Sequence, residues 1–572
     1  MKKIAAIILG LVLLGAGAYF ALFGGATNNE YARYLPQDAA VTLNLLHLSE
    51  LSDTFAASAL GQFLGKDTMH AVLSDMGGTA RDLAEYDRMF DDVAGVMTNP
   101  AFRAVFGADA AVALLAPDPG VMRANPVQAL RDSLVVVSRT TVAGALDLFS
   151  RMVKNANISR QDMDGLELTK VVIDPQQTLY GYTEGRMVFL AYNPEAIKRC
   201  LAAADKGGRQ LDRTVGFARA ADYWQAISRE QTYFRLFVNP QELSRLLAAA
   251  GKPEFKQSAA LFQGVDGLYS VAYAGEEGLE SRARAAYRYD QLDPVVKSAV
   301  DAATSPNPTL SLLREQSLAY SWASALRPEL LTRVLVANDP EDQRIDAGVR
   351  ELLGVGLEEL GRAFGPQYGG VLDDIVRAAL FPVPRMTLFV SLRDRAVAQK
   401  MVDTLRAKIA ENGMIKEEQE QVAGHTVYCW PLLPDKDAQP ALAMTDTMLY
   451  LATSKGALRE VLQSTATADS LAAPVATGLG ASLAKRVGAA NTGSLVLYPR
   501  RMSAKTGETL DWLAGILATT KNISLSRLNR EVIRLMQSTE ILALTSNMSR
   551  EQAEWTLTLR RAQPQAQSNT AK

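Results

Sequence analysis

The stretch MVFLAYNPEAIKRCL, residues 187–201, returns in altered form as MLYLATSKGALREVL, residues 448–462. Five of the fifteen aligned positions are identical. Each stretch opens with large apolar residues typical of a strand, and continues with apolar residues spaced three and four apart, as on one face of a helix. Asn193 and Ser454 stand at the junctions, where their side chains can cap the first amides of a helix. The sequence therefore predicts a strand, a cap and a helix in both places.

Other short segments recur in the same order along the chain, at separations of 253 to 273 residues. The pairs are Phe106 with Phe364, Ser138 with Ser391, Gly165 with Gly424, Val238 with Leu497, and Gly267 with Glu540. Several matches in constant order and at nearly constant separation favour a tandem duplication of a unit of about 260 residues, which lies in or close to the usual size range of a domain.

The pattern within each copy predicts an α+β fold. Strands cluster and are joined by short connections containing Gly and Asp, instead of alternating regularly with helices, which favours antiparallel pairing. We therefore expect two homologous domains, residues 28–300 and 301–561, each a mainly antiparallel sheet flanked by helices. The segment TSPNP, residues 304–308, is the expected boundary, and residues 562–572 form a polar tail that is expected to be disordered.

The N-terminus predicts a membrane anchor. Lys2 and Lys3 precede an uncharged apolar run from Ile4 to Phe23, which is long enough to cross a bilayer as a helix. Lysines before the run favour a cytoplasmic N-terminus and export of the remaining chain. We expect residues 1–27 to cross a bacterial inner membrane once, with the bulk of the chain in the periplasm. A cleaved signal peptide is the alternative, because small residues occur at cleavage-like spacing.

Composition limits the classes of partner. The 60 Lys and Arg residues nearly balance 62 Asp and Glu residues, and a net charge of -2 gives no general attraction to nucleic acid. The chain has two cysteines, so it carries no disulfide framework. Cys200 falls on the apolar face of its predicted helix and reads as a small core residue. A disulfide between Cys200 and Cys429 is the alternative.

Two segments resemble a known family. YLPQDAAVTLNL, residues 34–45, and FGADAAVALL, residues 106–115, are similar to a bacterial family of membrane-anchored envelope proteins of unknown function. Members of that family open with a Leu-Pro-x-Asp-Ala strand after an N-terminal anchor. The resemblance extends over residues 31–290 and again over the second copy. It implies an envelope location and this architecture, and it carries over no catalytic residues.

Motifs for cofactors and metals are incomplete. GQFLGKDT, residues 61–68, has three residues where a phosphate-binding loop needs four, and GVGLEELG, residues 354–361, lacks the dinucleotide spacing. The histidines, His47, His70 and His425, are scattered and have no metal-binding spacing. Acidic pairs beginning at Asp91, Asp373 and Glu417 are interpreted as solvated charge, since sequence neighbours do not share a face. We expect no cofactor and no metal.

The predicted function is that of a non-enzymatic binding or scaffolding protein, with another envelope protein as its partner. One alternative is a periplasmic carrier or chaperone for a lipid or other apolar ligand, held on a sheet surface that includes Phe189, Leu190, Tyr450 and Leu451. The competing explanation is that these four residues fill an ordinary hydrophobic core. A second alternative is an unrecognised hydrolase whose site is assembled from distant residues.

Overall fold

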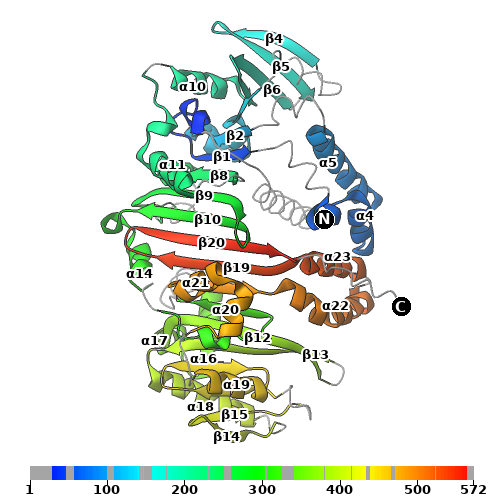
Figure 1. The fold of residues 1–572 in the computed structure, drawn as a ribbon, viewed down its shortest axis with the longest axis vertical. Coiled ribbons are helices and arrows are strands. Elements are labelled where there is room, and N and C mark those ends of the chain that lie inside the picture. The colour runs from blue at the N-terminus through cyan, green and yellow to red at the C-terminus, as the bar shows by residue number, and fades with distance from the viewer. Residues whose placement is uncertain are drawn as a thin grey trace. The chain divides into compact units, whose positions relative to one another are not determined.

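The computed structural model divides into two compact units (Figure 1), the first made of residues 1–297 and 550–554 and the second of residues 298–549 and 555–572. The structure describes residues 29–562 except for 47–56, 99–108, 141–143, 145, 147–156, 175–176, 206, 228–231, 250–258, 260, 303–305, 325–339, 379–380, 412, 414, 433–438, 466–469 and 522–523.

The first unit is built on antiparallel strands that pair in the order β4-β5-β6-β7-β3-β2-β1-β8-β9-β10. Side chains on one face of these strands form a core around Phe189, Trp224 and Phe237. The strands are β1 Val41–Leu46, β2 Asp109–Leu114, β3 Leu134–Arg139, β4 Asn157–Met163, β5 Leu166–Asp174, β6 Gln177–Glu184, β7 Met187–Ala191, β8 Thr232–Val238, β9 Val265–Gly275 and β10 Gly278–Tyr287.

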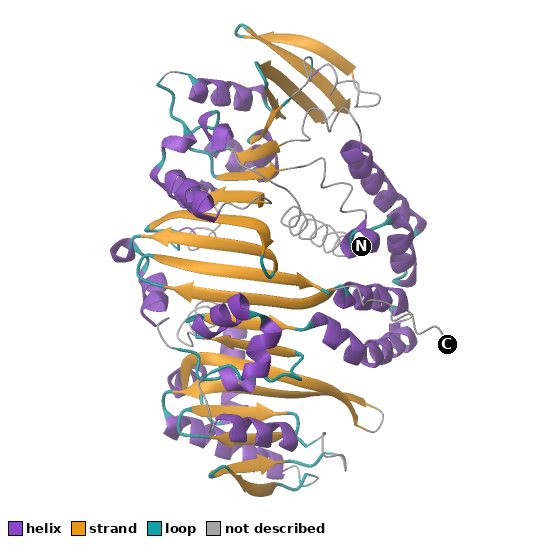
Figure 2. Ribbon diagram, in the orientation of Figure 1, coloured by secondary structure: helices purple, strands orange, loops and turns teal. Residues whose placement is uncertain are grey.

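Helices α10 and α11 contribute to this core, α10 next to β7 and α11 next to β9 (Figure 2). A smaller apolar cluster, which includes Met69, Leu73 and Tyr86, holds α4 against α5. The helices are α3 Ala59–Phe63, α4 Lys66–Asp75, α5 Ala80–Thr98, α7 Pro119–Ala124, α8 Pro126–Asp132, α10 Pro194–Ala204, α11 Val215–Ile227 and α12 Pro240–Ala249, with α14 Pro294–Ala302 at the unit boundary.

The strands of the second unit pair in the order β14-β15-β16-β17-β13-β12-β11-β18-β19-β20, the same order as in the first unit. One face of the strands carries a core around Tyr320, Phe389 and Tyr450. The strands are β11 Ala319–Ala323, β12 Phe364–Ala378, β13 Phe381–Leu392, β14 Glu418–Val422, β15 His425–Cys429, β16 Ala441–Met444, β17 Met448–Ala452, β18 Gly493–Leu497, β19 Thr539–Met548 and β20 Gln552–Arg561.

Helices cover parts of both faces in the second unit. Helices α19, α20 and α21 pack on the core that contains Tyr450, and α16, α17 and α18 pack on a second apolar cluster around Val402 and Leu442. The helices are α16 Pro340–Leu353, α17 Leu357–Ala363, α18 Arg395–Glu411, α19 Lys455–Thr465, α20 Ala473–Leu479, α21 Ala481–Ala489, α22 Pro499–Lys521 and α23 Ser526–Gln537.

The strand, cap and helix predicted in both places are confirmed. Asn193 Oδ1 accepts a hydrogen bond from the backbone N–H of Glu195 at 3.0 Å, and α10 begins at Pro194. In the second unit Ser454 Oγ accepts from the backbone N–H of Ala457 at 3.4 Å, just before α19. Local sequence predicts these junctions because the cap partner lies within three residues of the cap.

An ion pair ties this helix to the segment before the first strand of each unit, with the charges exchanged. Arg199 Nη2 in α10 lies 2.9 Å from Asp38 Oδ2, in the Leu-Pro-x-Asp-Ala segment. In the second unit Glu460 Oε2 in α19 lies 2.5 Å from Arg314 Nη1. Both units therefore have an ion pair between this helix and the segment before the first strand, with cation and anion exchanged. The attraction needs only that the two charges are opposite.

The predicted fold class is wrong. We expected an N-terminal transmembrane helix followed by two homologous α+β domains, each with its own sheet, whereas the structure is a large antiparallel sheet of 20 strands. The reason is that local patterning predicts strands but not where a sheet ends, since any unpaired strand edge can continue the ladder. Within the described residues no helix combines the length and apolarity needed to span a bilayer.

The predicted anchor lies outside the described residues, including Lys2, Lys3, Ile4 and Phe23. Most of the helix expected after β3 lies outside them as well. The two predicted domain ranges and descent from a tandem copy remain predictions.

The β4–β5 and β14–β15 hairpins turn through two residues with positive φ. The first turn uses Asp164 at φ 55° and Gly165 at φ 84°, and the second uses Ala423 at φ 49° and Gly424 at φ 82°. Two positive φ values are the signature of the type I′ hairpin turn, which favours Asn or Asp followed by Gly. Alanine is poorly suited to this conformation because its Cβ crowds the backbone.

Replacing Ala423 with Asn should raise the free energy of unfolding by about 0.5–1 kcal/mol, because Asn adopts positive φ more readily than Ala. The measurement is the midpoint of urea unfolding followed by circular dichroism. The reciprocal change Asp164→Ala should lower the midpoint. A less stable A423N protein would contradict the strain assigned to this turn.

Candidate functional site

A β-bulge interrupts β12 in the second unit. The ladder with β13 is broken between Phe364 and Tyr368, so residues 365–367 stand opposite Ser391. Pro366 has no N–H to give to a ladder and therefore fits a central strand only at such a bulge. Ser391 Oγ accepts a hydrogen bond from the backbone N–H of Gln367 at 3.0 Å. Ser391 thus holds the bulged backbone in place.

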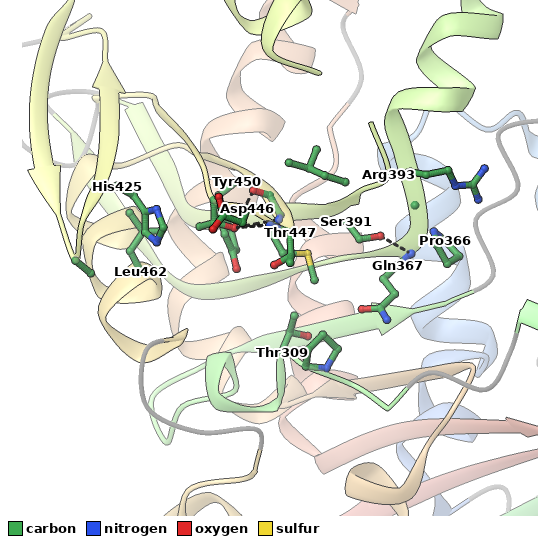
Figure 3. Close-up of a pocket in the computed structure, with 16 residues that line it drawn as sticks. Thr309, Pro366, Gln367, Ser391, Arg393, His425, Asp446, Thr447, Tyr450 and Leu462 are labelled. Carbon is green, nitrogen blue, oxygen red and sulfur yellow. Dashed lines mark hydrogen bonds between the residues drawn. The ribbon is translucent and has the colours of Figure 1, made fainter. Parts of the chain in front are cut away.

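The bulge forms one wall of an open pocket of about 670 Å³, a size within the range of small-molecule sites. In Figure 3, His425 and Leu462 lie at one end, Arg393 and Pro366 at the other, and Tyr450 between them. The pocket is lined by Pro308, Thr309, Gly365, Pro366, Gln367, Ser391, Leu392, Arg393, Ala423, His425, Thr445, Asp446, Thr447, Met448, Tyr450 and Leu462.

Two polar groups in the pocket have no partner among the described residues. Tyr450 is 2% exposed, and burial alone raises the pKa of its phenol to about 12. Its hydroxyl makes no hydrogen bond to the described part of the chain. Gln367 Oε1 is buried and likewise accepts no hydrogen bond there. Buried polar groups are normally paired, and Gln367 Oε1 is an exception that is closed off even with the pocket empty, whereas the Tyr450 hydroxyl is not among the fully buried, unpaired atoms.

The charged residues of the pocket lie at its rim. Asp446 has a side chain that is 83% exposed, and its Oδ1 lies 2.5 Å from Arg395 Nη1. Arg393 is exposed, whereas the floor residues Met448 and Leu462 are buried. The floor of the pocket is therefore uncharged. At the rim, the charge of Asp446 is partly neutralised by Arg395.

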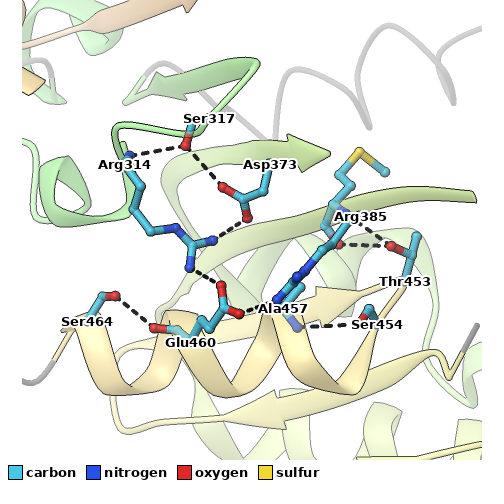
Figure 4. A network of polar contacts seen from close by, with 10 residues as sticks. Arg314, Ser317, Asp373, Arg385, Thr453, Ser454, Ala457, Glu460 and Ser464 are labelled. Carbon is cyan, nitrogen blue, oxygen red and sulfur yellow. Dashed lines mark hydrogen bonds and ion pairs between the residues drawn. The ribbon is translucent and has the colours of Figure 1, made fainter. Parts of the chain in front are cut away.

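A buried ion-pair network lies beside a second bulge of β12, after Leu372 (Figure 4). Arg314 contacts Asp373, whose side chain is 4% exposed, and also contacts Glu460, which pairs with Arg385. Burial raises the pKa of Asp373, and the charge of Arg314 opposes that shift. The prediction that Asp373 is solvated is wrong, because the bulge turns its carboxylate inward.

The four residues predicted for an apolar-ligand surface do not share one environment. Phe189 belongs to the core of the first unit and Tyr450 to that of the second. Leu190 is 8% exposed. Leu451 is 47% exposed and stands opposite Leu388 of β13, which is 44% exposed. The described structure thus places two residues inside cores and leaves Leu451 on the surface, and the ligand surface itself stays a prediction.

Other predicted candidates are placed as follows. His47 lies outside the described residues, and His70 Nε2 lies 2.6 Å from Asp87 Oδ1. No cluster of three metal-ligating side chains occurs among the residues that the structure describes. Cys200 and Cys429 are both free and buried, and burial raises the pKa of the Cys200 thiol to about 12.

Sequence reasoning missed most of the pocket. Gln367, Ser391 and Thr447 come from separate strand ends and turns, and no short motif joins them. One local signal was available, because Pro366 interrupts an otherwise strand-like segment and a proline in a central strand indicates a bulge. That signal predicts an irregular backbone but not the residues that face it.

No protein-family profile and no curated protein matches the chain. A comparison with solved structures finds the structure of crystal form III of TP0453, with 8% sequence identity and a TM-score of 0.22. The match covers 48% of this chain and 88% of that one. A TM-score this low supports no conclusion about fold or function.

Removing the Tyr450 hydroxyl should leave stability unchanged or slightly raised, because that group has no partner to lose. Tyr320 provides a matched control, since its buried hydroxyl lies 2.8 Å from Asn307 Nδ2 and 2.9 Å from Thr309 Oγ1. Tyr320→Phe should cost about 1–3 kcal/mol by leaving these groups unpaired. Thermal unfolding of Y450F and Y320F would show the difference. Equal losses would contradict the assignment.

Breaking the buried network should be costly. Arg314→Met leaves Asp373 as an uncompensated buried charge, which typically destabilises by about 3–5 kcal/mol. The matched control is Arg395→Met, which removes the exposed pair with Asp446 and should change stability by less than about 1 kcal/mol. Urea unfolding of both variants compares the two pairs. An R314M protein as stable as R395M would show that the network is solvated.

Proposed function

We propose that the protein is a non-enzymatic binding protein and that its ligand occupies the pocket at the β12 bulge. The observation that carries this proposal is an open pocket of about 670 Å³ whose floor residues, Met448, Tyr450 and Leu462, are buried and uncharged. A concave pocket of this size with an apolar floor and polar groups at its rim is the usual form of a small-molecule site.

The local chemistry favours binding over hydrolysis. A serine nucleophile needs a general base within hydrogen-bond reach. Ser391 Oγ accepts from the backbone N–H of Gln367, and the histidine of the pocket, His425, lies at the end away from Ser391 (Figure 3). Asp446 is held by Arg395 at the exposed rim. Ser391 and Asp446 thus each have a structural partner. The location of the chain and the identity of an envelope partner remain predictions.

The test is native mass spectrometry of the full chain purified in mild detergent. Thr447 lies exposed at the pocket rim, so Thr447→Trp should fill the opening and remove a co-purifying ligand mass. Thr183→Trp is the matched control, since Thr183 is an exposed threonine in β6 of the first unit. We expect the wild type and T183W to carry the ligand mass and T447W to lack it.

Two results would count against this function. Retention of the same bound mass by T447W would place the ligand elsewhere. Absence of any bound mass from the wild type, together with no protection of the pocket from chemical labelling in cell extract, would mean that the pocket is not a ligand site.

A further inference from the structure

We infer that the pocket takes an aromatic side chain, such as that of tyrosine, carried by a partner polypeptide. This inference rests on the proposed ligand site and specifies what enters it. The first unit fills the corresponding place with Tyr31 of its own chain, whose side chain is buried there. The second unit has no tyrosine at that position, and its pocket is open.

Backbone hydrogen bonds fix which residues of the segments before the first strands correspond. The N–H of Ala40 donates to a carbonyl of β2, and the N–H of Leu318 donates to a carbonyl of β12, each at 2.8 Å. The carbonyls of the same two residues accept from the residues that directly follow β8 and β18. Tyr31 and Thr309 each lie nine residues before these positions. Thr309 is therefore the counterpart of Tyr31.

Strand pairing fixes the residues on the opposite side. Arg139 pairs with the first residue of β7, and Ser391 pairs with the first residue of β17. Asp109 and Gln367 each lie five residues before the position of β2 or β12 that pairs with the first residue of β1 or β11. Arg139 and Asp109 are therefore the counterparts of Ser391 and Gln367, both of which line the pocket.

In the first unit the two sides are in contact. The segment before β1 forms the 3-10 helix η1, Asn29–Arg33, and Tyr31 within it is 2% exposed. The hydroxyl of Tyr31 donates to the backbone carbonyl of Asp109 at 3.0 Å. Glu30 Oε2 lies 3.5 Å from Arg139 Nη1. The helix η1 thus closes directly over the ends of β2 and β3, with the ring of Tyr31 between them.

In the second unit the two sides are separated by the pocket. Thr309 lines one side, and Gln367 and Ser391 line the other (Figure 3). The hydroxyl of Thr309 donates to Asn307 Oδ1 at 2.8 Å and lies 2.9 Å from the hydroxyl oxygen of Tyr320. This short side chain is therefore held within its own segment and does not fill the space that a tyrosine fills in the first unit.

The second aromatic residue of η1 and its flank has a replacement, which leaves one vacant place. The ring centroid of Tyr34 lies 5.7 Å from that of Phe189. Its counterpart by the same count is Leu312, which is buried in the core that contains Tyr450. The segment 306–318 has no aromatic residue. The pocket therefore corresponds to the place of Tyr31 alone.

The walls of the pocket suit a ring. Two prolines, Pro308 and Pro366, offer apolar surface, and Met448 offers a thioether, which makes favourable contacts with aromatic rings. An aromatic side chain buries about 150–250 Å² and so gains more from such a pocket than a smaller side chain does. In the first unit the ring arrives on a polypeptide segment, and an open pocket of about 670 Å³ leaves room for a backbone beside the ring.

The test is saturation-transfer NMR of the full chain in mild detergent. The probes are N-acetyl-tyrosine methylamide, p-cresol and N-acetyl-leucine methylamide, each at millimolar concentration. Pro308→Tyr should plug the pocket, because Pro308 is half-buried and adjoins the counterpart of Tyr31. Pro308→Ala is the matched control, since it removes the same proline and leaves the pocket open. We expect the tyrosine probe to bind the wild type and P308A and to lose its signal in P308Y.

A second measurement on the same variants needs no probe. A ring that fills the pocket removes apolar surface from water, so the midpoint of thermal unfolding should be higher for P308Y than for P308A. A midpoint of P308Y at or below that of P308A would show that the pocket does not accept a ring.

The probes separate the sources of a ring from other apolar groups. Binding of p-cresol without the tyrosine probe would overturn the polypeptide source in favour of a small free phenol. Binding of the leucine probe as strong as that of the tyrosine probe, and equally lost in P308Y, would overturn the preference for an aromatic ring. Equal binding of the tyrosine probe to P308Y and P308A would place the ring outside this pocket.

Failure of the ligand class is distinguishable from failure of the proposed function. If no probe binds while T447W still removes a co-purifying mass, the pocket is a ligand site and the aromatic assignment is wrong. If no probe binds and the wild type carries no bound mass, both the assignment and the proposed function are wrong.

Discussion

The packing of one helix against the inner face of antiparallel strands is the constraint on which each unit depends. In the first unit Ile197 and Cys200 of α10 share a core with Phe189 of β7, and in the second Leu458 and Val461 of α19 share one with Tyr450 of β17. These side chains are removed from water, which is the main favourable term in folding. The remaining elements are arranged around this contact.

The ion pair at the same helix shows that the charges around this packing contact can be exchanged between the two units. The helix carries the cation in the first unit and the anion in the second, paired with Asp38 and Arg314 respectively. In the second unit the pair is extended by Asp373, which a bulge of β12 turns inward. The bulge of β12 therefore places a carboxylate in the interior, while the order of the strands stays the same.

The two bulges of β12 set the second unit apart from the described ladder between β2 and β3, which runs without a register shift. One bulge holds the ion-pair network, and the other forms a wall of the pocket. Ser138 and Ser391, which end corresponding strand segments, both bond to backbone of the neighbouring strand. Ser138 Oγ donates to the carbonyl of Asp109, whereas Ser391 Oγ accepts from the N–H of Gln367. The same residue type thus supports a regular ladder in one unit and a bulge in the other.

The sequence by itself determined the local elements: the strands, the caps at Asn193 and Ser454, and the buried helix faces, because each depends on residues within one or two turns. Only the tertiary structure decided where the sheet continues, that Asp373 is buried, and that Gln367 and Tyr450 both line one pocket. These depend on pairing between strands far apart in the chain and on a bulge that redirects side chains. The local spacing of apolar residues does not predict such contacts, because the same pattern is compatible with several strand partners and several pairing registers.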